Sequence, residues 1–124
     1  MARVQQGFRS RNLATAEITP LLEQGDLADY QAEIAKVQVV PAIQHYIVQI
    51  VHATRNHRHL LLGASPRASI NLLLTAKTCA AIQGRTFVTP DDVKRLAYPI
   101  LRHRLLIRPE AEIEGYTSER VIEG

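Results

Sequence analysis

The sequence has one cysteine, no tryptophan and few aromatic residues, with four tyrosines and two phenylalanines among its 124 residues. Because Cys79 is alone, no disulfide bond can form within the chain. It lies inside an apolar stretch, residues 72–82, which favours an inert packed thiol, since a catalytic thiolate needs an open, electropositive site. The bases of single-stranded nucleic acid stack on aromatic rings, so nucleic acid is not an expected partner.

Long apolar runs are also missing. No run approaches the roughly 20 residues that a transmembrane helix requires. Residues 1–11 lack the apolar segment of a signal peptide. The sequence therefore predicts no membrane partner and no secretory signal, and the expected compartment is the cytoplasm.

The motifs of two common kinds of site are absent as well. The six glycines are too dispersed for the G-x-x-x-x-G-K-[ST] loop that cradles the α- and β-phosphates of a nucleotide. No cysteine or acid stands at ligand spacing from the histidines at 52, 57, 59 and 103, so no metal site is predicted. We expect this chain to bind nucleotide weakly or not at all by itself, and to be inactive alone.

Charge is distributed unevenly along a mildly basic chain of formal net charge +3. Residues 94–108 contain five cations and no carboxylate, whereas residues 110–123 contain five carboxylates and one arginine. Two solvated faces that partly neutralise each other would explain this pattern. The alternative is a contact surface: a helical DNA- or protein-binding module that uses the basic run 94–108.

Helical periodicity and capping residues dominate the rest of the sequence. Apolar residues fall at helical spacing in two stretches, Leu27, Tyr30, Ile34 and Val37, then Ile43, Tyr46, Ile47, Ile50 and Val51. A third helix should begin at Pro66 and end before Gly84, and a fourth should follow Thr89-Pro90. We predict an all-α bundle of about four main helices, with short extended segments that can pair into a minor β-sheet.

The start of the third helix carries the one candidate site. Ser65 can cap this helix and Pro66 suits its first position. Arg67 then adds a cation in the first turn, where the helix dipole disfavours it unless an anion is present. Unpaired N–H groups together with a guanidinium are suited to a phosphate group. From these residues alone, a solvated or ion-paired arginine is the more usual outcome, and the phosphate site is the alternative.

The run GASPRASINLLLTAKTCAAIQGRTFVTPDDVKRLAYPILRHRL, residues 63–105, resembles the helical lid of MoxR-type AAA+ ATPases. Residues 46–55, YIVQIVHATR, are similar to the first lid helix of that family. The resemblance extends over about residues 26–124, which would form the lid. Residues 1–25 would be the partly disordered tail end of the ATPase core and the linker. The missing phosphate-binding loop then implies that the chain is a piece of a longer ATPase.

The resemblance also implies roles for individual residues and partners. Arg67 matches the sensor 2 arginine, which reaches the γ-phosphate of ATP bound in the core domain and stabilises charge during hydrolysis. Ser65 stands beside it, and Tyr46 and Ile47 would pack near the adenine ring unless both are ordinary core residues. ATP would be bound with Mg²⁺ held by the core domain. Implied partners are that core domain, neighbouring subunits of a ring, and von Willebrand factor A-type proteins, in a chaperone-like function.

Overall fold

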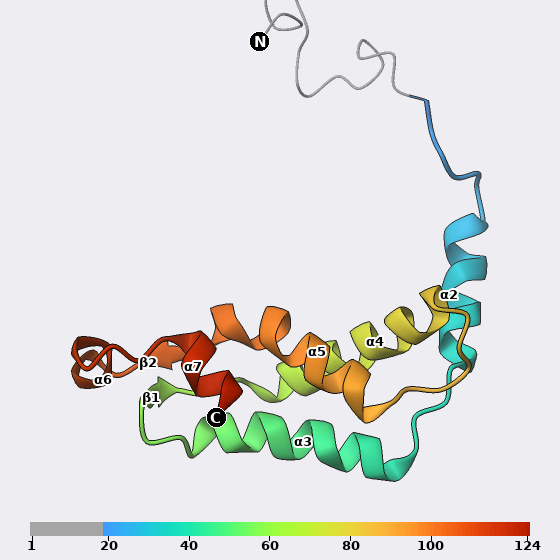
Figure 1. Ribbon diagram of the computed structural model, residues 1–124. Helices are drawn as coiled ribbons and strands as arrows, with labels where there is room; N and C mark the ends of the chain where they lie inside the picture. The colour runs from blue at the N-terminus through green and yellow to red at the C-terminus, as the bar shows by residue number, and fades with distance from the viewer. Residues whose placement is uncertain (1–18) are drawn as a thin grey trace, which may run out of the picture. The chain divides into compact units, whose positions relative to one another are not determined.

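The structure, a computed structural model, describes residues 19–124 (Figure 1). The disorder predicted for the N-terminal part falls largely on residues 1–18, outside this range. The chain divides into two units, residues 1–31 and 32–124. Helix α2 (Asp26–Lys36) begins in the first unit and ends in the second. Gly25, directly before α2, has a φ of 102°.

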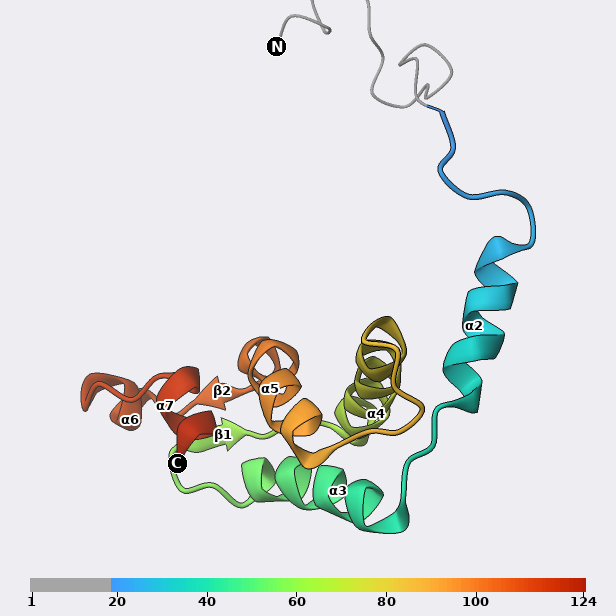
Figure 2. The ribbon, with the colours of Figure 1, turned by 45° about the vertical axis from the view of Figure 1, so that its right-hand side comes forward.

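Residues 32–124 form a mostly helical bundle with a very small sheet. Helices α3, α4 and α5 run alongside one another, and the later elements gather near the end of α3 (Figures 1 and 2). The elements that follow α2 are α3 (Pro41–Arg55), β1 (Leu60–Leu62), α4 (Pro66–Ile82), α5 (Pro90–Leu101), the 3₁₀ helix η2 (Arg102–Arg104), β2 (Leu106–Ile107), α6 (Pro109–Ile113) and α7 (Ser118–Glu123). The predicted fold class is therefore confirmed. Between residues 19 and 124, no helix is long and apolar enough to cross a membrane.

The core lies where α3, α4 and α5 meet. Ile47 of α3, Leu72 of α4 and Val93 of α5 are each at most 2% exposed and belong to one cluster of buried side chains. Ala68, Ala76 and Ala80 of α4 have no exposed surface. Small side chains at these positions let α3 and α5 approach α4 closely, which is how a short bundle excludes water from its interior.

Extended segments form two separate pairings, one of which includes β1, a strand that the sequence did not predict. Strands β1 and β2 are antiparallel, with Leu60 opposite Ile107 and Leu62 opposite Leu106. Farther along, Gln38 and Phe87 form an isolated parallel bridge in which Val88 N–H donates to the Gln38 carbonyl at 3.1 Å. These pairings link chain segments that are distant in sequence and hold the ends of the helices together.

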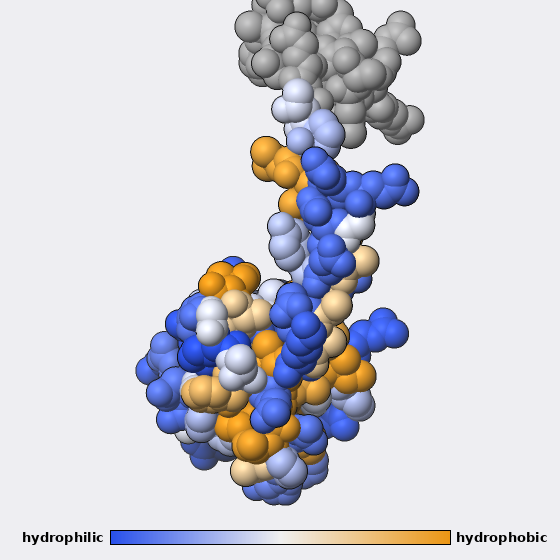
Figure 3. Space-filling view, turned by 90° about the vertical axis from the view of Figure 1, so that its right-hand side faces the viewer, coloured by the Kyte–Doolittle hydropathy of each residue, from blue (hydrophilic) through white to orange (hydrophobic). Residues whose placement is uncertain are grey.

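Two apolar helix faces are less buried than their sequences predict. Helix α2 has no buried residue, and Leu27 and Tyr30 of its apolar stripe are 61% and 54% exposed. Helix α4, apolar on most sides, buries one stripe, whereas Ile70, Leu74 and Ile82 remain exposed. Figure 3 shows apolar side chains at the surface among hydrophilic ones. Neighbouring exposed apolar side chains, such as these, are typical of surfaces that contact another protein or domain.

The turn from α4 to α5 is fixed by two sets of hydrogen bonds. Gly84 has a φ of 71°, and Arg85 N–H donates to the Ala80 carbonyl at 2.9 Å, so α4 ends in the left-handed conformation that its glycine predicted. Thr89 and Asp92 then form a reciprocal capping box at the start of α5. Arg85 donates two hydrogen bonds to the Asp92 carboxylate, from Nη1 to Oδ2 at 2.8 Å and from Nη2 to Oδ1 at 2.7 Å.

The hydrogen bonds from Arg85, followed by those from Thr89, lower the pKa of Asp92 from 3.8 to about 2. Replacing Asp92 with asparagine should lower the free energy of unfolding at pH 7 by about 2 kcal/mol or more, because a nearly buried ion pair loses one partner. Since the folded-state pKa is depressed, the stabilisation is present above pH 3.8 and is lost as the pH falls toward 2. Urea unfolding of wild type and Asp92→Asn across this pH range measures the effect.

The neighbouring exposed carboxylate provides the control for this experiment. Asp91→Asn changes the same charge in the same first turn of α5 and should cost only a few tenths of a kcal/mol. An Asp92→Asn protein as stable as wild type at pH 7, or a difference that persists unchanged at pH 2, would contradict the prediction.

Candidate functional site at the start of α4

The segment that leads into α4 is held by the last turn of α3. The Thr54 side chain is buried, and its Oγ1 donates to the Val51 carbonyl at 2.7 Å and accepts Ala64 N–H at 2.9 Å. Arg55 Nε donates to the Ala64 carbonyl at 2.9 Å. Both backbone polar groups of Ala64 are thus bonded to α3 side chains, which fixes where α4 begins.

Gly63 is required here by lack of space. A Cβ atom on this residue would lie 2.5 Å from the Thr54 carbonyl oxygen and 2.6 Å from the backbone nitrogen of Arg55. Because both atoms belong to the backbone of α3, neither can move aside as a flexible side chain would. Only glycine allows the chain to pass this close to the helix.

Ser65 and Pro66 occupy the positions that the sequence predicts, with one correction. Ser65 is the N-cap residue of α4 and Pro66 opens the helix. The Ser65 side chain, however, makes no capping hydrogen bond. The fixed φ of Pro66 and the bonds to Ala64 set the start of the helix instead. Pro66 has no N–H group, and Ala68 N–H donates to the Ser65 carbonyl at 2.9 Å.

Arg67 lies in this first turn with an exposed side chain. No acidic residue stands in the first turn of α4, and none of the ion pairs or hydrogen bonds found between residues 19 and 124 involves the Arg67 guanidinium. No carboxylate of residues 19–124 therefore pairs with it. A cation beside the positive end of a helix dipole is mildly unfavourable, so an incoming anion would be attracted by both. The role of Arg67 as a phosphate sensor stays a prediction.

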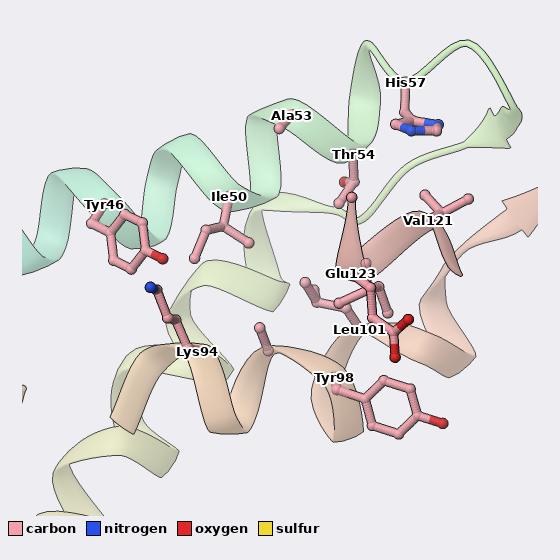
Figure 4. Close-up of a pocket in the computed structure, with 13 residues that line it drawn as sticks. Tyr46, Ile50, Ala53, Thr54, His57, Lys94, Tyr98, Leu101, Val121 and Glu123 are labelled. Atoms are coloured by element: carbon pink, nitrogen blue, oxygen red, sulfur yellow. The ribbon is translucent and has the colours of Figure 1, made fainter. Parts of the chain in front are cut away.

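The structure separates the two residues predicted to lie near an adenine ring. Ile47 is 2% exposed and belongs to the core, which leaves its side chain almost no surface for a ligand. Tyr46 is half-buried and lines a pocket of about 720 Å³ between α3, α5 and α7 (Figure 4). Of the four predicted binding residues, Tyr46 alone lines this pocket; Ser65 and Arg67 do not.

The pocket beside Tyr46 is mainly apolar with polar groups at its edge. Ile50, Leu101 and Val121 contribute apolar surface, and in Figure 4 the Tyr46 hydroxyl and the Lys94 amino group point toward each other. At the far side, Tyr98 donates a hydrogen bond to Glu119 at 3.2 Å, which joins α7 to α5.

The basic run 94–108 is partly used for contacts within the chain. Arg95 Nη2 lies 3.3 Å from Asp92 Oδ1, and Arg108 Nε donates to the Leu60 carbonyl at 3.1 Å. Arg102 lies over the Tyr98 ring, 5.4 Å from its centroid. These contacts orient the three side chains, which nevertheless stay exposed at the surface.

Sequence reasoning missed Thr54, Arg55 and Gly63 as parts of this site. A signal for Thr54 existed, because it continues the apolar stripe of α3 that includes Ile47 and Val51, and a hydroxyl among apolar side chains needs a partner. Nothing in the local sequence shows that this partner is Ala64, ten residues farther along the chain.

Comparison with known proteins identifies the type of domain. The AAA lid domain family model matches residues 52–124. The chain is 38% identical over 114 residues to the uncharacterised protein YeaC of Bacillus subtilis, covering 92% of this chain and 35% of that protein. It is 35% identical over 111 residues to the chaperone MoxR1 of Mycobacterium tuberculosis, covering 82% of this chain and 29% of that protein.

A solved structure agrees with these sequence matches. A crystallised protein from Cytophaga hutchinsonii, assigned as an ATPase, superimposes with a TM-score of 0.79 at 34% sequence identity, covering 99% of this chain and 38% of that one. The chain thus spans about a third of the length of the relatives it matches. The residues matched by the family model include all of α4 and the Arg67 site, and the chain belongs to the AAA lid domain family.

Proposed function

We propose that this chain is the lid of a MoxR-type AAA+ ATPase and that Arg67 is its sensor 2 residue. In this proposal the lid closes over ATP bound in the core domain, and Arg67 contacts the γ-phosphate. The observation that carries the proposal is the position of Arg67: an exposed guanidinium that forms no ion pair with any residue of 19–124, at the start of a helix that α3 holds in place.

The proposed chemistry is electrostatic. A guanidinium placed against the transferring phosphoryl group stabilises the negative charge that builds up on its oxygens. The positive end of the α4 helix dipole adds to the same potential. The chain supplies this cation only. The phosphate-binding loop and the residues that hold Mg²⁺ would belong to the core domain, so hydrolysis would require the whole protein.

The same proposal assigns roles to the rest of the chain and to its partners. Residues 26–124 would be the lid, and residues 1–25 the end of the core and the linker. Tyr46 would lie near the adenine ring, and the exposed apolar side chains of α4 would contact the core domain or a neighbouring subunit of a ring. Closure of the lid would couple ATP hydrolysis to chaperone-like remodelling in the cytoplasm, with von Willebrand factor A-type proteins among the partners.

Nucleotide selectivity in the full-length protein tests the role of Arg67. A γ-phosphate contact should make Arg67→Ala bind a non-hydrolysable ATP analogue about tenfold more weakly, because a charge-assisted hydrogen bond is lost. Affinity for ADP should stay the same, since ADP has no γ-phosphate. Calorimetric titration of both nucleotides measures this, and an equal loss for both would show that Arg67 does not distinguish them.

The alternative function, DNA binding through the basic run 94–108, has a separate test. Phosphate contacts by Arg102 and Arg104 would give duplex binding that weakens steeply with salt. Because part of the run is engaged within the chain, we expect a flat titration of duplex DNA even at low salt. Binding that is lost in an Arg102→Ala, Arg104→Ala variant would favour the alternative.

A further inference from the structure

Three contacts connect the last turn of α3 to the segment that precedes Arg67. Thr54 Oγ1 accepts Ala64 N–H at 2.9 Å, and Arg55 Nε donates to the Ala64 carbonyl at 2.9 Å. Gly63 approaches the backbone of α3 so closely that no side chain fits. Ala64 stands three residues before Arg67, and the Pro66 ring makes the backbone between them stiff. The position of Arg67 is therefore coupled to α3.

The Thr54 hydroxyl is the central group of this connection. Ala64 has no exposed surface, so water cannot replace a lost partner for its N–H group. The hydroxyl also donates to the Val51 carbonyl at 2.7 Å, which orients its lone pairs toward Ala64. Without the hydroxyl, the buried N–H would be unpaired, and the segment would have to shift to find another acceptor. Such a shift displaces the start of α4 together with Arg67.

We propose that Thr54, assisted by Arg55, is a positioning residue that holds Arg67 at the correct place for the γ-phosphate. The proposal rests on the function proposed for Arg67 above. Thr54 also lines the pocket beside Tyr46, but it is only 8% exposed and its one hydroxyl proton is donated to the Val51 carbonyl, so its main contacts are within the chain.

Thr54→Val in the full-length ATPase tests this role, because valine keeps the shape of threonine and removes only the hydroxyl. We expect kcat to fall roughly tenfold, since a displacement of about 1 Å is enough to weaken a transition-state contact. The preference for a non-hydrolysable ATP analogue over ADP should fall, while ADP affinity stays unchanged. Thr54→Ser, which restores the hydroxyl, should return both quantities to near wild-type values.

Thr78→Val is the matched control. It makes the same chemical change on α4, where the hydroxyl donates only to the Leu74 carbonyl of its own helix at 2.9 Å. Both quantities should stay near wild type. Should Thr54→Val fail to fold, Arg55→Met removes the bond to the Ala64 carbonyl together with one positive charge, and Arg55→Lys, which keeps the charge, separates the two effects. In both variants the analogue preference should fall in the same direction by less.

A double-mutant comparison separates positioning from general damage. In the Arg67→Ala background, adding Thr54→Val should leave the analogue preference unchanged, because the group that it positions is gone. Wild-type kcat and preference in Thr54→Val would overturn the positioning role, and so would an equal loss of preference in both backgrounds. If Arg67→Ala alone keeps wild-type preference and turnover, the function proposed for Arg67 fails, and the positioning role fails with it.

Discussion

If Arg67 acts as the proposed sensor 2 residue, replacing it with alanine in the full-length protein should lower kcat for ATP hydrolysis by about 100-fold or more, with the fold unchanged. The size of the expected loss in kcat follows from the surroundings of Arg67. The guanidinium is exposed and pairs with no carboxylate of residues 19–124, so its charge is available to a phosphoryl group that becomes more negative in the transition state. Steady-state hydrolysis at saturating ATP measures the loss, and circular dichroism checks the fold.

Two further variants make the interpretation specific. Arg67→Lys keeps the positive charge but loses the planar fork that can grip two oxygens, so part of the rate should remain. Arg58→Ala removes another exposed arginine, which bonds to the His59 ring, and should leave kcat near wild type. Turnover of Arg67→Ala within twofold of wild type would exclude a catalytic role for this residue.

The largest loss of stability is expected from Gly63→Ala. The new Cβ would lie 2.5 Å from the Thr54 carbonyl oxygen and 2.6 Å from the Arg55 Cα, well inside van der Waals contact with fixed backbone atoms. The segment before α4 would have to move away from α3, which breaks the bonds to Ala64 and opens the core beneath it. We expect the free energy of unfolding to fall by about 3 kcal/mol, measured by urea denaturation of the 124-residue chain.

Gly84→Ala is the matched comparison, because at Gly84 the backbone conformation is unfavourable for alanine but the space for a Cβ atom is open, the reverse of Gly63. Gly84 has a φ of +71°, but the Cβ that alanine adds would meet nothing within 4 Å. The cost therefore comes from backbone strain alone and should be about 1 kcal/mol. If Gly84→Ala proved more destabilising than Gly63→Ala, the close approach of Gly63 to α3 would not be the dominant constraint on this segment.

The sequence predicted the helices well because their ends carry local chemical signals. Pro66 sets the beginning of α4 and Gly84 sets its end, each through its own φ preference. Thr89 sets the beginning of α5 through its capping hydroxyl. Burial was predicted less well. The exposed Ile70 and Leu74 look like core residues in sequence, because hydrophobicity alone does not distinguish a side chain covered by this chain from one that another domain can cover.

In the candidate site, too, local sequence patterns indicate which residues to consider but not which atoms they contact. Arg67 could be found from its position in a motif, and Tyr46 and Ile47 from their neighbours in sequence. Adjacent residues on a helix point in directions about 100° apart, and the structure was needed to show that Ile47 turns into the core and Tyr46 toward a pocket. The hydrogen bond between Thr54 and Ala64 depends on the path of the chain between them, which no local pattern specifies.

Helix α4 is anchored at both of its ends. Near its beginning, α3 holds Ala64, and just beyond its end Arg85 is locked to Asp92 at the start of α5. Its 17 residues span about 26 Å at 1.5 Å per residue. Because both ends of α4 are bonded to neighbouring helices, a displacement of Arg67 would also act on α5 through the Arg85–Asp92 pair.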